Sequence, residues 1–193
     1  MFWSNNFISR IISAFFFVMV FTIILPLDLV PAVSGQHHGA PPPAANIGDR
    51  KIALEFETQP NPIKIGQDVE IKISFADETV KKKNVNHVTF RTDISKDGKR
   101  LLSEFFHSHE GNVNLSFKDT IKATSTSTYT IGANLDMLTN AWIADPGNSI
   151  TIRGGEIFSQ PGTYKAVIEV TTMDNDKTDL PQPILYEINI PVL

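Results

Sequence analysis

Residues 160–170 read Gln160-Pro161-Gly162-Thr163-Tyr164-Lys165-Ala166-Val167-Ile168-Glu169-Val170. The Pro-Gly pair is typical of a turn. After it, every second residue from Tyr164 to Val170 is apolar or small, so these side chains share one face of an extended strand. This stretch therefore predicts a turn followed by a strand with one buried face, and the rest of the chain is interpreted outward from it.

Tyr164 lies two residues after the turn glycine. In immunoglobulin-like sandwiches, a tyrosine at this place opens strand F, and its hydroxyl binds backbone a few residues upstream. Ala166 stands where antibody domains carry a disulfide cysteine, and the chain contains no cysteine at all. The segment resembles strand F of a cysteine-free immunoglobulin-like sandwich, which implies an all-β fold of two antiparallel sheets.

The same period-two alternation recurs along the chain, for example in Lys51–Phe56, Val69–Phe75, Val113–Phe117 and Ile184–Ile190. Alternation of this kind is what a sheet with one buried face requires. Seven or eight such strands, separated by turn residues, predict one immunoglobulin-like sandwich over residues 50–193.

One segment departs from this alternation. Leu135, Leu138 and Trp142 follow each other at helical spacing, and Asn134 is a suitable N-cap. We interpret residues 133–148 as a long insertion with one or two helical turns, in which Trp142 plugs one end of the sandwich.

The first 34 residues form a predicted targeting segment. Arg10 precedes an apolar run over residues 11–25, and small residues lead to a suitable cleavage point after Ser34. Residues 1–34 are thus a signal peptide or an uncleaved membrane anchor, and residues 35–49, rich in proline, are a flexible tether. Either alternative places the sandwich outside the cytoplasm, with the membrane contacted only through an uncleaved N-terminus.

Composition narrows the classes of partner. The net charge is −4, and the short basic run Lys81-Lys82-Lys83 is typical of a loop tip, so a nucleic-acid partner is not expected. The sequence has no nucleophile elbow and no phosphate-binding loop. We therefore expect a non-enzymatic binding or structural module at the cell surface, whose partner is a protein or surface ligand that the sequence does not identify.

A wider resemblance covers about Arg50 to Leu193. It rests on an Asp-Gly hairpin at Asp97-Gly98, then the run His107-Ser108-His109-Glu110-Gly111 before an alternating strand, and then the Pro-Gly-Thr-Tyr turn. This order resembles a group of exported archaeal immunoglobulin-like proteins of unknown function. It is also loosely similar to small periplasmic copper-resistance sandwiches, although this chain lacks their methionine-rich cluster, so copper binding is not carried over from that likeness.

The alternative function is transition-metal binding or delivery. His107 and His109 are two residues apart, so both imidazoles point to one face of a strand. Copper and zinc both accept neutral imidazole, and the sequence does not separate them. Glu110 is a further candidate ligand. His37 is a weaker one, because cleavage after Ser34 would place it third in the mature chain, where the amine, amides and imidazole suit Cu(II).

Whether His87 joins this pair depends on the hairpin between them. A bulged type I turn at Ser95–Gly98 pairs His87 with His107 and puts three histidines on one face. A two-residue Asp97-Gly98 loop shifts the pairing by one residue, and His87 then lies on the opposite face. The turn residues suit the first register, whereas the side-chain pairs match better in the second. The sequence therefore leaves both registers open.

Overall fold

The structure is a computed structural model that describes residues 41–193, except 82, 119–128, 145–146 and 176–178. The described residues belong to one compact unit. The predicted signal or anchor segment and the first part of the tether, residues 35–40 with His37, lie outside the described residues. No helix within the described ranges is long and apolar enough to cross a membrane.

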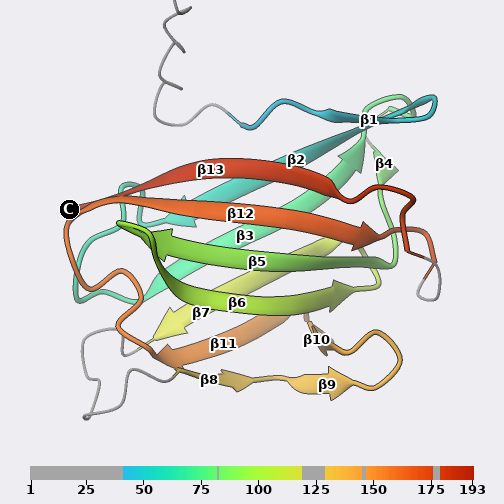
Figure 1. The fold of residues 1–193 in the computed structure, drawn as a ribbon. Coiled ribbons are helices and arrows are strands. Elements are labelled where there is room, and N and C mark those ends of the chain that lie inside the picture. The colour runs from blue at the N-terminus through green and yellow to red at the C-terminus, as the bar shows by residue number, and fades with distance from the viewer. Residues whose placement is uncertain (1–40, 82, 119–128, 145–146, 176–178) are drawn as a thin grey trace, which may run out of the picture. The chain divides into compact units, whose positions relative to one another are not determined.

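The described residues form an all-β sandwich of two facing sheets (Figure 1). The first sheet has seven strands: β1 (Ala45–Ile47), β2 (Arg50–Gln59), β3 (Val69–Asp77), β4 (Lys83–Asn84), β7 (Asn112–Lys118), β8 (Tyr129–Gly132) and β11 (Ser149–Gly154). Its order is β1-β2-β3-β7-β11-β8, and β4 pairs with β3.

The second sheet has six strands: β5 (Val88–Lys96), β6 (Lys99–Ser108), β9 (Asn134–Asp136), β10 (Ala141–Ile143), β12 (Gly162–Thr172) and β13 (Ile184–Val192). Its order is β13-β12-β5-β6-β10-β9. The chain passes from β8 at an edge of the first sheet directly to β9 at an edge of the second (Figure 1).

The core lies between the two sheets and is built by the alternating residues that the sequence indicates. Phe75 of the first sheet packs against Phe90 of the second, with ring centroids 5.1 Å apart. Tyr186 on β13 donates a hydrogen bond across the core to the Ile52 carbonyl on β2, at 2.8 Å. Burial raises the pKa of Tyr186 to about 12, so this hydroxyl stays protonated and keeps donating.

Two features of the predicted sandwich are wrong. The described residues hold thirteen strands rather than seven or eight, because strands of two to four residues, such as β4 and β8, are too short to give a period-two signal. The sheets are also mixed rather than purely antiparallel: β11 pairs parallel with β7, and β10 pairs parallel with β6. The long connection from β7 to β11 makes this possible, since parallel neighbours need an extended crossover.

The predicted tether also ends earlier than expected. Its last residues, Ala45–Ile47, form β1 and pair antiparallel with Arg50–Ile52 through a turn at Gly48. Gly48 has a φ of 54°, which a glycine adopts without strain. The ordered sheet therefore begins before residue 50.

The predicted contact between the Tyr164 hydroxyl and upstream backbone, called the tyrosine corner below, is confirmed. Tyr164 is 1% exposed, and its hydroxyl donates to the Gln160 carbonyl at 3.1 Å while accepting from the Gln160 N–H at 3.2 Å. The ring packs against Phe158, with centroids 5.2 Å apart. The hydroxyl therefore holds the turn that leads into β12.

Replacing Tyr164 by phenylalanine should keep the packing and remove both hydrogen bonds. We expect the free energy of unfolding to fall by about 1–2 kcal/mol, because the Gln160 backbone loses its partner. Urea denaturation of the two proteins measures this difference. An unchanged midpoint would show that the corner contributes nothing to stability.

The segment predicted to contain helical turns is instead a hairpin of β9 and β10. The Asp136 carboxylate accepts hydrogen bonds from the Leu138 and Thr139 N–H groups, and Asn140 has a φ of 50°, so the chain reverses between the two strands. Leu138 is 60% exposed, so the apolar spacing does not mark a buried helical face.

Trp142 of this hairpin helps to close one side of the sandwich. Its indole Nε1–H donates to the Glu104 carboxylate at 2.9 Å, and the Tyr129 hydroxyl on β8 donates to the same carboxylate at 2.6 Å. Burial, and then the hydrogen bond to Glu104, raise the pKa of Tyr129 to about 12. The two sheets are thus joined here through one carboxylate.

Candidate metal site

The β5–β6 hairpin determines how the histidines meet. Its turn is the two-residue Asp97-Gly98 loop, with Lys96 paired to Lys99 and with φ values of 49° and 78° at the turn residues. Both residues are left-handed, as a type I′ turn requires. The two-residue alternative is therefore the correct one at the turn itself.

A β-bulge then changes the register further along the hairpin. Ser95 pairs with Arg100, but Ile94 pairs with Leu102, so Leu101 is the extra residue. Because a slip of one residue exchanges the two faces, the bulge reverses the face that the two-residue turn alone would assign to His87. Neither predicted register is right beyond Leu101.

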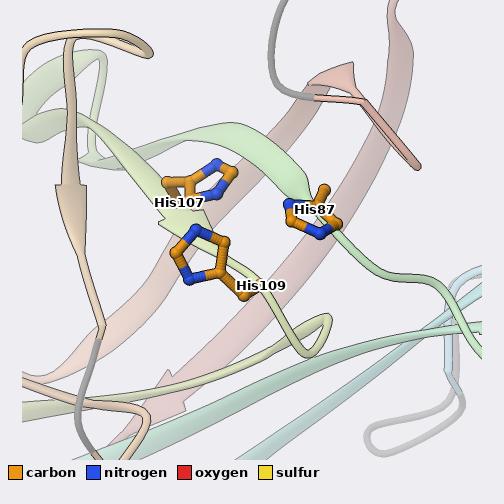
Figure 2. A group of neighbouring side chains, drawn as sticks. All are labelled: His87, His107 and His109. Carbon is orange, nitrogen blue, oxygen red and sulfur yellow. The ribbon is translucent and has the colours of Figure 1, made fainter.

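The shifted register brings the three histidines together. His107 on β6 pairs with Thr89 on β5, and the His87 N–H donates to the His109 carbonyl at 3.1 Å. His87 lies just before β5 and His109 just after β6, so the two strand ends meet here. Figure 2 shows the three side chains gathered between these ends.

The imidazole rings are close, and the His109 ring meets each of the other two edge to face. Ring centroids are 4.8 Å apart for His107 and His109, 5.1 Å for His87 and His109, and 6.3 Å for His87 and His107. One ring nitrogen from each histidine lies within 4.8 Å of the others. The three residues are the ones that sequence reasoning singled out, and the structure places them together.

The ring nitrogens lie slightly farther apart than they would in a metal complex. With metal–nitrogen bonds of about 2.0–2.1 Å, tetrahedral ligands lie roughly 3.3 Å apart. The nitrogens must therefore approach each other by at most about 1.5 Å, because none of them is more than 4.8 Å from the others. His109 is exposed and His87 half-buried, so these two side chains have room to rotate towards a metal.

His107 is the fixed member of the group. It is fully buried, and its Nδ1 lies 2.9 Å from the Thr89 hydroxyl. Thr89 is itself held from β12, because its N–H donates to the Thr172 hydroxyl at 3.2 Å and its carbonyl accepts from Thr171. If Nε2 binds a metal, Nδ1 carries the proton and donates to Thr89, which orients the ring.

Replacing Thr89 by valine should therefore weaken metal binding without changing the ligands. We expect a loss of about 10–100-fold in affinity, which is typical when the hydrogen-bond partner of a metal-binding histidine is removed. Competition with a chromophoric chelator measures the affinity.

Thr92 provides the matched control for this prediction. It lies on the other face of the same strand, is 1% exposed, and its hydroxyl has no hydrogen-bond partner within the described part of the chain. Thr92→Val should leave the affinity unchanged. Equal losses in both variants would mean that Thr89 acts only through general stability.

Asp136 is a neighbour of the site that sequence reasoning missed. The side-chain hydrogen bond from Thr139 is the main cause that lowers the pKa of Asp136, with smaller contributions from the Leu138 and Thr139 N–H groups and from the charge of His107. The carboxylate therefore stays charged near His107. Asp136 and Thr89 come from β9 and β5, and no local spacing in the sequence relates them to His107.

The other predicted ligands do not join the group. The Glu110 carboxylate accepts a hydrogen bond from the Asn148 side chain at 2.9 Å, and the metal-binding group among the described residues contains only the three histidines. His37 lies outside the described residues.

A shallow pocket lies beside the candidate metal site. Its volume is about 600 Å³, and its lining includes Thr89, Phe105, Leu138 and Leu180. Thr89 thus contributes both to the wall of this pocket and to the hydrogen bond that holds His107.

Comparisons with known proteins do not identify a function for this chain. No protein-family model matches the chain, and no curated protein sequence matches it. Among solved structures, the chain is similar to a β-glucosidase from Listeria innocua in complex with glucose, with 8% identity and a TM-score of 0.29. The match covers 77% of this chain and 17% of the glucosidase. A likeness this weak carries no functional argument.

Proposed function

We propose that this chain is an exported, non-enzymatic module that binds a transition-metal ion, Cu(II) or Zn(II), through His87, His107 and His109. The observation that carries the proposal is the convergence of three imidazoles from two strand ends, with one nitrogen of each within 4.8 Å of the others. Neutral imidazole is the most common protein ligand for both metals. The sequence predicts a binding module without identifying its ligand, and in this proposal that ligand is a metal ion.

The scaffold that we propose is an immunoglobulin-like sandwich. Its support is the corner at Tyr164, whose hydroxyl binds the backbone four residues upstream, together with the two facing sheets. Export is supported by the apolar run over residues 11–25 and by the small residues Ala32 and Ser34 at the expected cleavage point. The module would be either secreted or held at the membrane by an uncleaved N-terminal helix. In both cases it would meet metal ions outside the cytoplasm.

The test is a metal titration of the full chain, prepared without a histidine tag and freed of metal. Because His37 and His38 are separate candidate ligands, we would compare the parent with a His37→Ala plus His38→Ala protein. We expect both to retain one Zn(II) per chain after desalting, measured by elemental analysis.

A second variant, His107→Ala plus His109→Ala, should lose this metal. Circular dichroism of that variant would show whether the β-sheet spectrum is kept. Retention of zinc by the folded double variant, or uptake of neither zinc nor copper by the parent, would overturn the proposed function.

A further inference from the structure

We propose that the three-histidine site leaves one coordination position of the bound metal open to a small external ligand. This inference rests on the proposed function, because it requires that the metal be bound. The inference assigns the class of ligand that this open position would accept. That class is water or hydroxide, or a small anion such as azide.

The number of donors is the first argument. Cu(II) and Zn(II) take at least four ligands, whereas the described residues bring three imidazoles together and no carboxylate. In zinc enzymes, three protein ligands with a fourth position for water is the arrangement of an open site. A closed site would need a fourth protein donor.

Within the described ranges, the two carboxylates considered as further ligands accept hydrogen bonds from other groups. Glu110 accepts a hydrogen bond from Asn148, and Asp136 accepts three within its own turn, from Leu138 N–H and from both the N–H and the hydroxyl of Thr139. Cysteine does not occur in the sequence. Met173 is 8% exposed and packs in the core.

The direction of the open position follows from the burial of the ligands. His107 is 0% exposed, whereas His109 is exposed and His87 half-buried. Protein would therefore cover the metal on the His107 side, and solvent would reach it on the His109 side. Three neutral imidazoles leave the full positive charge on a divalent ion, which favours a small anion at the remaining position.

The experiment uses Cu(II)-loaded full chain with His37 and His38 replaced by alanine, titrated with azide. We expect a new charge-transfer absorption band and a shift in the electron paramagnetic resonance spectrum, both saturating with one azide bound per copper. Copper should stay bound throughout, as shown by elemental analysis after desalting.

The outcomes separate this inference from the proposed function. If the chain retains neither copper nor zinc, the proposed function fails. If copper binds but azide changes neither spectrum, a protein donor fills the position and the open-site inference fails. Met137, on the exposed β9–β10 turn, is the donor to examine: azide binding that occurs only in Met137→Leu protein would also overturn the open site.

Discussion

Replacing His107 by asparagine should abolish metal-induced stabilisation of the protein. Asparagine places a polar atom near the position of Nδ1, so it can keep the contact with Thr89, but it has no atom at the position of Nε2. A ligand present at 100 times its dissociation constant stabilises the folded state by about 2.7 kcal/mol. We expect the parent to gain this amount with zinc and the variant to gain almost none, as measured by urea denaturation with and without metal.

His109→Asn is the comparison for this variant. His109 is exposed and lies at the end of β6, so its loss should weaken binding while His87 and the fixed His107 still hold the metal. The loss should therefore be smaller than for His107→Asn. A larger loss at His109 would contradict the role of His107 as the anchoring ligand.

Replacing Gly111 by alanine should produce the largest loss of stability. Gly111 follows the histidine run and has a φ of 72°, and a Cβ added there would lie 1.8 Å from the Val85 carbonyl oxygen. That carbonyl belongs to backbone that is held in place, since the Val85 N–H donates to the Phe75 carbonyl. The left-handed strain and the forced displacement together should cost about 3–5 kcal/mol.

Gly98→Ala is the matched control, because its φ is 78° and no atom lies within 4 Å of an added Cβ. It should cost only about 1–2 kcal/mol, the strain of a left-handed alanine. Both values come from denaturant unfolding. Similar losses at the two glycines would show that the approach of Val85 does not constrain the turn after His109.

The sequence predicted the parts of the fold that depend on local pattern. The alternation of residues along β3, β12 and β13 predicted which face of each strand is buried. The turn before Tyr164 was also predicted, and Tyr164 has the backbone hydrogen bonds expected of it. The β9–β10 hairpin was missed because the Asp136 turn, rather than the spacing of Leu135 and Leu138, determines the conformation there.

The candidate site was predictable in its residues but not in its geometry. The spacing of His107 and His109 placed both on one face, whereas His87 depended on the register of the hairpin. That register depends on the bulge at Leu101, which no residue type in the sequence marks. Thr89 was missed because its contact with His107 exists only once the strands pair in this register.

The most direct test of the account is a zinc titration followed by ¹H–¹⁵N spectra of the imidazole rings, in the full chain with His37 and His38 replaced by alanine. We predict that the signals of His87, His107 and His109 shift together and stop changing at one equivalent of zinc. Signals that shift independently of one another, or a His107 signal that does not respond, would contradict a shared metal site.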